Sequence, residues 1–311
     1  MENKKSKARI FNLQKYNTYD GPGVRTIVFF KGCKMRCKWC SNPEGVESKY
    51  AVMYMQNMCK HCGNCVPVCP VGIHVMDNGT HKVMRNIDCL GCRNCQNVCL
   101  QTAIAIFGEN KSIPDMLAQI SKDRIFYDLS GGGVTLSGGE VSLQETAATA
   151  LLSACKQEGI NTAIETCGYG ELSSLLSLAQ FTDLFLYDIK LMDSQKHFLY
   201  TGVNNEVILE NFKELMGRKY PICVRVPLIK GINDCTDNIS KMVDFLLPFK
   251  RQENFKGVNL LPYHKMSVSK YAALGRVYEL KDGDYSMTEQ RLLEIEQILN
   301  SNGLNASIIR H

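Results

Sequence analysis

One short stretch decides the organisation of this chain: Thr26-Ile-Val-Phe-Phe-Lys-Gly-Cys33-Lys-Met-Arg-Cys37-Lys-Trp-Cys40. Its first half is β-branched and aromatic, which predicts a buried strand that ends at Gly32. Three cysteines follow, and no fourth lies near them in sequence. Because structural metal sites normally use four protein ligands, three thiolates leave one coordination position open. The stretch predicts a catalytic metal centre; the alternative is a zinc site completed by a distant histidine or cysteine.

The cysteine content points to metal binding rather than to disulfides. Fifteen cysteines occur in 311 residues, and most fall between Cys33 and Cys99. The chain shows neither an apolar stretch of about 18 residues nor the apolar core of a secretory signal. We therefore expect a cytoplasmic protein, not bound to membranes, whose thiols stay reduced and available to metals.

Eight further cysteines form two runs with the spacing of bacterial ferredoxins. The first run ends in Cys69-Pro70, and the second ends in Cys99-Leu100, which departs from the pattern. In such pairs the fourth cysteine of each run binds the other cluster. We predict one 4Fe-4S cluster on Cys59, Cys62, Cys65 and Cys99, and another on Cys89, Cys92, Cys95 and Cys69. Two zinc sites are the alternative. The insert is expected to span residues 55–105.

The rest of the chain, residues 1–54 and 106–311, predicts an α/β domain. Near-continuous apolar runs recur every 20 to 40 residues, as buried parallel strands with crossover helices require. Helices are expected over 143–158 and, behind a capping box at Ser286–Glu289, at the end of the chain. Polar side chains follow successive strands, and that edge binds ligands in parallel barrels: Ser137, Glu140, Glu165, Thr166, Asp188, Lys190, Arg225 and His264.

The net charge does not indicate nucleic-acid binding. The formal charge is +5, but three oxidised clusters with their thiolates would carry a comparable negative charge. The chain also has no run of Lys or Arg longer than two. We expect a monomer that does not bind nucleic acid.

The Cys33-Cys37-Cys40 spacing resembles that of the radical S-adenosylmethionine superfamily. The flanking Asp20-Gly-Pro-Gly-Val-Arg25 and Ser41-Asn-Pro-Glu44 resemble its branch of glycyl-radical-enzyme activating enzymes. The segments Tyr16–Gly23, Leu261–Met266 and Ile309–His311 most resemble activators of choline trimethylamine-lyase. The resemblance covers nearly the whole chain and implies a partial (β/α)6 barrel with the ferredoxin-like insert.

The resemblance also assigns roles to residues. It implies that the open iron of a third 4Fe-4S cluster, on Cys33, Cys37 and Cys40, binds S-adenosylmethionine. It implies a monovalent cation near Glu165 and Thr166, where Glu replaces the commoner Asp. The implied contacts of S-adenosylmethionine are Trp39, Asn42, Gly138, Gly139, Glu140, Asp188, Lys190, Arg225 and His264. Of the remaining cysteines, Cys155 and Cys223 are expected in the core, and Cys167 at the site.

The implied activity is an oxidoreductase reaction of anaerobic metabolism. Flavodoxin or ferredoxin supplies an electron, S-adenosylmethionine is cleaved, and the resulting radical takes hydrogen from a backbone glycine of a partner glycyl radical enzyme. We expect the partner to open locally so that the glycine enters the barrel. Three alternatives stay open: activation of a different glycyl radical enzyme, a radical enzyme acting on a small molecule, and a ferredoxin-type electron carrier.

Overall fold

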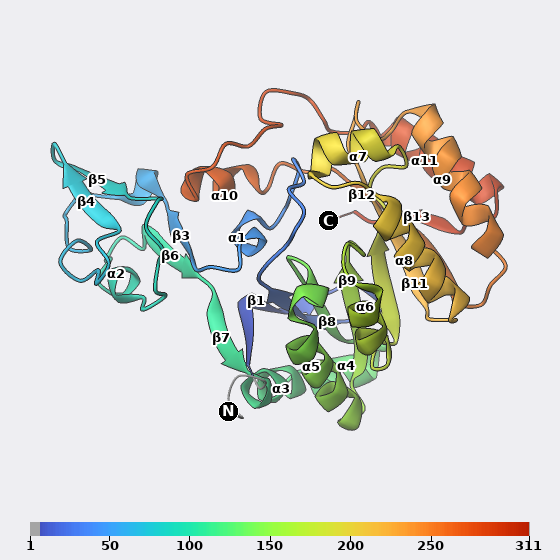
Figure 1. Cartoon of the computed structure of the whole chain (residues 1–311), viewed down its shortest axis with the longest axis horizontal. Coiled ribbons are helices and arrows are strands. Elements are labelled where there is room, and N and C mark those ends of the chain that lie inside the picture. The colour runs from blue at the N-terminus through green and yellow to red at the C-terminus, as the bar shows by residue number, and fades with distance from the viewer. Residues whose placement is uncertain (1–6, 311) are drawn as a thin grey trace.

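A nine-stranded sheet runs through the larger part of the protein (Figure 1). The computed structural model describes residues 7–310, so the predicted domain boundary at residue 1 and the terminal His311 lie outside the described residues. The sheet order is β13-β12-β11-β10-β9-β8-β2-β1-β7. From β2 to β13 all neighbours are parallel. These strands are β2 (Arg25–Phe30), β8 (Gly133–Gly138), β9 (Asn161–Thr166), β10 (Leu184–Asp188), β11 (Ile222–Leu228), β12 (Phe255–Pro262) and β13 (Ala306–Ile308).

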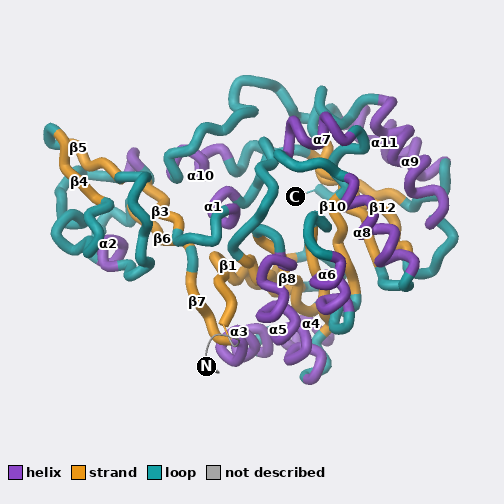
Figure 2. Tube along the Cα trace, in the orientation of Figure 1, coloured by secondary structure: helices purple, strands orange, loops and turns teal. Residues whose placement is uncertain are grey.

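Helices cover the outer face of this curved sheet (Figure 2). They are α3 (Ile113–Ser121), α4 (Arg124–Ser130), α5 (Glu145–Gln157), α6 (Leu172–Ala179), α7 (Ser194–Thr201), α8 (Glu206–Gly217), α9 (Thr236–Leu246) and α11 (Glu289–Ser301), with short 3-10 turns η3 (Val141–Gln144) and η4 (Leu247–Phe249). The predicted α/β fold with a partial barrel of six parallel strands is confirmed, and β13 extends it. Within residues 7–310, no helix combines the length and apolar composition needed to cross a bilayer.

The predicted helices are present, with shifted starts. The helix expected over 143–158 begins at Glu145 after the η3 turn, and its expected core residue Cys155 is fully buried. The predicted capping box at Ser286–Glu289 is wrong. Thr288 caps α11, because its side chain accepts a hydrogen bond from the Arg291 N–H. An apolar pattern sets the buried face of a helix, whereas a cap depends on local backbone dihedrals.

Residues 51–107, from β3 to β6, form a projection beside the barrel, at the left of Figure 1. Strands β3 (Ala51–Tyr54) and β6 (Ile104–Phe107) pair at its base, and β4 (His74–Asp77) and β5 (Thr80–Val83) form a hairpin. The projection also contains η2 (Gln56–Met58) and α2 (Asn94–Asn97). The chain returns through β7 (Glu109–Ser112) to β1 (Lys7–Asn17), which is antiparallel to both β7 and β2. Two short helices, α1 (Pro43–Val46) and α10 (Val268–Ala273), contact one another near the base.

Candidate functional site

The Cys33–Cys40 loop leaves the end of β2 and is held by backbone hydrogen bonds from two sides. On one side, the N–H groups of Gly32 and Cys33 donate to the carbonyls of Gly45 and Val46, at 2.7 and 2.8 Å. On the other, the N–H groups of Arg36 and Lys38 donate to the carbonyls of Thr201 and Tyr200 at the end of α7. These hydrogen bonds fix the positions of the three thiols, although the loop has no regular secondary structure.

Gly138 and Gly139 pass close to this loop at the end of β8. A Cβ at Gly139 would lie 2.1 Å from the Gly32 carbonyl oxygen, and one at Gly138 would lie 2.3 Å from that of Phe30. Gly138 also has a φ of +117°, which L side chains rarely adopt. The Glu140 N–H then donates to the Gly32 carbonyl at 2.6 Å. The two glycines are therefore required by the close contact between β8 and the cysteine loop.

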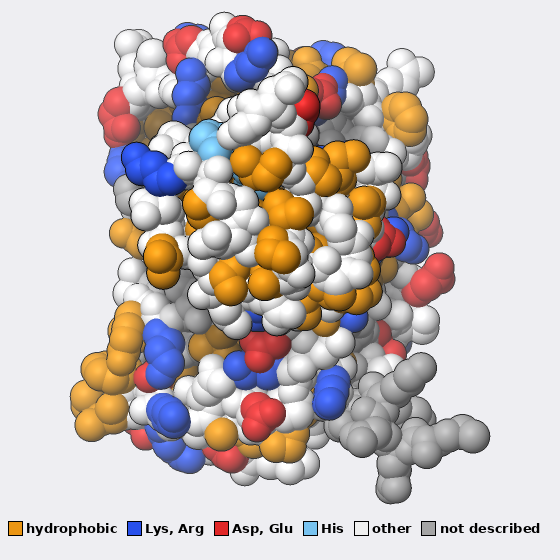
Figure 3. Space-filling model, turned by 90° about the vertical axis from the view of Figure 1, so that its left-hand side faces the viewer, with side chains coloured by type: hydrophobic (Ala, Val, Ile, Leu, Met, Phe, Trp, Pro, Cys, Tyr) orange, Lys and Arg blue, Asp and Glu red, His pale blue; other side chains and the backbone are white. Residues whose placement is uncertain are grey.

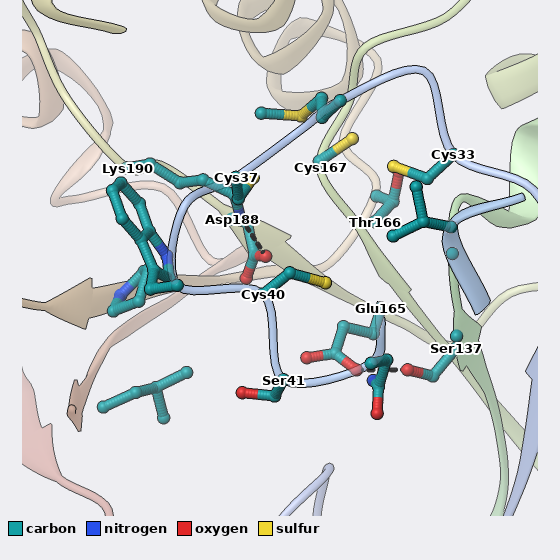
Figure 4. A pocket seen from close by; sticks show the side chains of 18 residues that line it. Cys33, Cys37, Cys40, Ser41, Ser137, Glu165, Thr166, Cys167, Asp188 and Lys190 are labelled. Atoms are coloured by element: carbon teal, nitrogen blue, oxygen red, sulfur yellow. Dashed lines mark hydrogen bonds and ion pairs between the residues drawn. The ribbon is translucent and has the colours of Figure 1, made fainter. Parts of the chain in front are cut away.

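The three thiols of the triplet line one cavity of about 190 Å³. Figure 4 shows them along one loop, facing the ends of β8, β9 and β10. The cavity wall includes Met35, Trp39, Ser41, Asn42, Ser137, Gly138, Gly139, Glu165, Thr166, Cys167, Asp188, Lys190, Pro227 and Leu261. Most sequence-predicted contact residues therefore share one cavity.

Burial and charge set the state of these thiols. Burial raises the pKa of Cys37 to about 12 and that of Cys40 to about 11. A hydrogen bond with Cys167 lowers the pKa of Cys33, although burial opposes it. The Lys190 cation lowers all three, and thiols must lose their protons to bind a metal. The positive charge of a bound metal would therefore favour the thiolate form of these three cysteines.

Asp188 and Lys190 form a buried ion pair at the end of β10. Lys190 Nζ lies 2.5 Å from Asp188 Oδ2. Burial alone would lower the pKa of Lys190, but Asp188, Cys37 and Cys167 raise it on balance. The other carboxylate oxygen, Asp188 Oδ1, is buried and accepts no hydrogen bond from the described residues. An unpartnered buried carboxylate oxygen that borders a cavity fits a cation or a hydrogen-bond donor there.

Arg225 lies in the middle of β11, not at the strand end that the sequence pattern predicts. Its Nη1 contacts Asp20 Oδ1 at 2.7 Å and Glu165 Oε1 at 3.1 Å. Burial raises the pKa of Glu165 to about 7, and Arg225 opposes that shift. Ser137 donates a hydrogen bond to the same carboxylate (Figure 4). Asp20 was missed among the site residues, although it stands in the Asp20–Arg25 motif.

A second cavity of about 480 Å³ adjoins the first. It contains Arg225 and His264, which do not line the cavity of the three thiols. The two cavities share Trp39, Ser41, Asn42, Glu165, Pro227 and Leu261. The residues predicted as one binding surface are therefore spread over two connected spaces.

Glu140 is 1% exposed and does not line the thiol cavity. Its carboxylate accepts hydrogen bonds from Thr166 Oγ1 at 2.8 Å and from the Cys167 N–H and Sγ, both at 2.9 Å. Cys167 is buried at the site, as expected from its place after β9. Glu140 thus positions the end of β9, and a direct contact with S-adenosylmethionine stays a prediction.

Helix α10 supports the cysteine loop from the side of the projection, a contact that no sequence motif predicted. Tyr271 donates from its hydroxyl to the Cys40 carbonyl at 3.3 Å, and Lys270 Nζ lies 2.6 Å from Glu44. Arg85, in the projection, donates to the carbonyl oxygens of Val52 and Ala273. The projection and the triplet are therefore connected through α10.

The eight other clustered cysteines gather around two small cavities in the projection. One cavity is lined by Cys59, Cys62, Cys65 and Cys99, and the other by Cys69, Cys89, Cys92 and Cys95. These are the two crossed sets that the ferredoxin pattern predicts. Cys155 and Cys223 are buried, whereas Cys235 is exposed.

Two family models match the cysteine-rich regions. A 4Fe-4S dicluster domain matches residues 58–103, and a 4Fe-4S single cluster domain matches residues 19–67. Among solved structures, a domain of pyruvate-formate lyase-activating enzyme from Bacteroides vulgatus is 32% identical, covers 57% of this chain and 98% of that one, and has a TM-score of 0.48.

Curated relatives match along almost the entire chain. The choline trimethylamine-lyase activating enzyme of Oleidesulfovibrio alaskensis is 52% identical over 98% of this chain and 99% of that protein. The trans-4-hydroxy-L-proline dehydratase activating enzyme of Clostridioides difficile is 40% identical over 96% and 98%. The indoleacetate decarboxylase activating enzyme of Tractidigestivibacter scatoligenes is 32% identical over 99% of both.

Proposed function

This chain belongs to the glycyl-radical-enzyme activating enzymes of the radical S-adenosylmethionine superfamily, and from that premise we propose that its partner is choline trimethylamine-lyase. The observation that carries this choice is the 52% identity to a choline trimethylamine-lyase activating enzyme, against 40% to the hydroxyproline dehydratase activator. Both matches extend over almost the full chain, so the difference does not arise from partial coverage.

The triplet cavity fits a 4Fe-4S cluster with S-adenosylmethionine. It combines three thiols with a buried, unpartnered oxygen of Asp188, the Lys190 cation and close-packed glycine backbone. Cys33, Cys37 and Cys40 would hold the cluster, which when bound would supply the one-electron reduction that cleaves S-adenosylmethionine and so allows hydrogen to be taken from the partner's glycine. The chain itself orients these groups and excludes water, since the apolar side chains of the wall include Met35, Val46, Pro227 and Leu261.

In this proposal, different groups of residues contact different parts of S-adenosylmethionine. Gly138 and Gly139 allow close backbone approach to the methionine part, and Asp188 with Lys190 borders the ribose or the carboxylate. Trp39 and Asn42 border both cavities, which suits the nucleoside. Arg225 and His264 then contact the part that extends into the second cavity. Glu140 acts by holding Thr166 and Cys167 in position.

A monovalent cation between β9 and β10 belongs to the proposal as well. Glu165 and the unpartnered Asp188 Oδ1 both border the thiol cavity, and carboxylates are suitable ligands for a hard cation. The measurement is S-adenosylmethionine affinity in potassium, sodium and a bulky organic cation. Equal affinity in all three would refute the cation site.

Residues 55–105, which make up most of the projection, are proposed as a domain with two auxiliary 4Fe-4S clusters, inserted into a barrel of residues 1–54 and 106–311. Four thiols around each cavity and pairing of β3 with β6 at the base support this division. Exposed Leu90 and Leu100 border the two cavities, and Figure 3 shows hydrophobic side chains gathered on the face of the molecule at that end. Such a surface suits a docking flavodoxin or ferredoxin.

The 480 Å³ cavity is the proposed entrance for the partner's glycine, because it adjoins the cavity of the triplet. A backbone glycine lies inside its own folded protein, so the partner must open locally to deliver it.

The activating enzyme is proposed to act in the cytoplasm as a monomer. Analytical ultracentrifugation of the reconstituted protein tests the monomeric state.

The decisive experiment is anaerobic reconstitution followed by electron paramagnetic resonance with purified lyases. We expect the glycyl doublet with choline trimethylamine-lyase and a weak or absent signal with hydroxyproline dehydratase and isethionate sulfite-lyase. A doublet with one of the latter alone would overturn the choice of partner. Rapid turnover of a small molecule without any protein partner would instead favour a small-molecule radical enzyme.

A further inference from the structure

Two buried histidines connect the two auxiliary cysteine sets, and the ferredoxin spacing gives no reason for them. His74 opens β4 and His81 lies in β5, and each is 2% exposed. His74 Nδ1 and His81 Nε2 are 3.0 Å apart, and the two rings pack at 5.1 Å. The pair belongs to the single hairpin between the two cysteine runs, and the second run has no such hairpin after it.

Each histidine borders a different cavity. His81 lines the cavity of Cys59, Cys62, Cys65 and Cys99, and His74 lines the one formed by the other four cysteines. His81 Nδ1 lies 3.9 Å from Cys59 Sγ. One ligand atom each from Cys65, His74 and His81 lie within 4.8 Å of one another. The hydrogen-bonded pair therefore spans the space between the two proposed clusters.

The chemistry of the pair fixes the direction of its hydrogen bonds. A cluster-bound thiolate carries no proton, so in any hydrogen bond with Cys59 the imidazole of His81 must donate. Neutral His81 then has its second nitrogen available as an acceptor, and His74 Nδ1–H donates to it. The His81 backbone N–H donates to His61 Nδ1 at 3.0 Å, which holds the hairpin against the first cysteine run.

We propose that His81, oriented by His74, is a positioning residue that donates a hydrogen bond to the Cys59 thiolate and raises the reduction potential of that auxiliary cluster. Hydrogen bonds to cluster sulfurs are among the determinants of cluster potential, because they stabilise the more negative reduced state. Backbone N–H groups donate to sulfurs of both sets, from His61 to Cys59 and from Ile73 and Gly91 to Cys69 and Cys89. His81 adds an imidazole donor to the Cys59 set, whereas His74, which borders the other cavity, donates to His81. The histidine pair therefore favours reduction of the Cys59 cluster.

The inference rests on the proposed pair of auxiliary clusters, and its test separates the two claims. The measurement is a potentiometric titration of the holoenzyme followed by electron paramagnetic resonance, with iron and sulfide content. We expect His81→Leu to lower one auxiliary potential. At a fixed potential the ratio of reduced to oxidised cluster should fall about tenfold, which is about 59 mV for a one-electron couple. His74→Leu should move the same cluster in the same direction by less.

Two variants control for structural damage. His81→Gln keeps a side-chain N–H and should retain most of the wild-type potential. His61→Asn keeps an acceptor for the His81 N–H and tolerates the positive φ of residue 61, so it should change neither potential. Should His81→Leu fail to assemble its cluster, the His74→Leu and His81→Gln shifts decide the matter.

Unchanged auxiliary potentials in His81→Leu and His74→Leu would overturn the inference, as would equal shifts in all three clusters. Absence of the auxiliary clusters from the wild-type protein would instead overturn the proposed cluster content. The two failures are distinguishable, because the first requires full iron content and the second is a deficit of iron.

Discussion

The cysteine triplet in the barrel and the two cysteine quartets in the projection, all proposed ligands of iron–sulfur clusters, differ in what surrounds their thiols. The triplet shares its cavity with a buried ion pair, an unpartnered carboxylate oxygen and bare glycine backbone. Each quartet surrounds a cavity bordered mainly by its own thiols, small polar groups and apolar side chains. Four thiolates close a coordination sphere, whereas three thiolates with polar neighbours leave one position for a reactant. The surroundings of the thiols thus separate the proposed catalytic centre from the two proposed closed clusters.

The largest expected effect comes from removing one thiol of the triplet. Cys33→Ala should abolish cleavage of S-adenosylmethionine while about eight of roughly twelve irons stay bound, since the quartets lie in a separate part of the chain. Iron analysis and detection of the cleaved nucleoside measure both outcomes. Cys235→Ala, at an exposed thiol outside all three sets, is the matched control and should keep full iron and activity. Loss of all iron in Cys33→Ala would show that the three sites assemble together.

The Asp188–Lys190 ion pair lies beside the triplet and has no counterpart among the quartets' ligands. Breaking it therefore tests whether the polar neighbours of the triplet contribute to its activity. Asp188→Asn should reduce S-adenosylmethionine cleavage about 10²-fold, because cofactor orientation is lost. It should also lower stability by about 3–5 kcal/mol, since Lys190 is left buried without its partner. Cleavage assays and anaerobic denaturant unfolding provide the readouts. Asp284→Asn breaks the exposed pair with Lys230 and should leave both readouts unchanged.

The sequence predicted more of the quartets than of the triplet's surroundings. Ligand spacing is local, so the order of cysteines alone anticipates which eight thiols surround which cavity. The direction of Glu140 is not local: its carboxylate turns toward Thr166 and Cys167 of the next strand. Arg225 lies in mid-strand, where its side chain pairs with Asp20 and Glu165 inside the barrel. Such contacts depend on tertiary packing across a sheet, which periodicity does not encode.

The strands show the same difference between local sequence signals and tertiary contacts. Apolar runs predicted a series of parallel strands, and β8 to β12 are such strands, because burial on both faces leaves a continuous apolar signal. The support of the cysteine loop by α10 gave no signal, since Tyr271 and Cys40 are 231 positions apart. The histidine pair was missed for a related reason: lone histidines in a hairpin are uninformative until the strands pair and bring them together.

A third prediction concerns the acidic wall of the triplet cavity and its pH dependence. Burial raises the pKa of Glu165 to about 7 from an ordinary value near 4.5. The folded protein therefore binds this proton more tightly than the unfolded chain. The resulting stabilisation is complete below about pH 4.5 and is lost as pH rises through 7, by up to about 3 kcal/mol.

Glu165→Gln should flatten this dependence, so the test compares slopes of unfolding free energy between pH 5.5 and 7.5 in the apo-protein. Arg225 keeps Asp20 as a partner in the variant, which limits other damage. Glu171→Gln, at an exposed residue before α6, is the control for adding a neutral amide. Parallel slopes in wild type and Glu165→Gln would contradict an elevated pKa at this carboxyl.

The smallest effect should come from the connection between the two regions. Tyr271→Phe removes one hydroxyl, whose hydrogen bond to the Cys40 carbonyl spans 3.3 Å at the edge of the triplet. One such bond contributes about 1 kcal/mol, so S-adenosylmethionine cleavage should fall about fivefold with full iron content. Tyr285→Phe lies in the same aromatic cluster and serves as the control for losing a phenol. A change in the auxiliary signals of Tyr271→Phe, with the catalytic signal unchanged, would contradict the contact, because its partner belongs to the triplet alone.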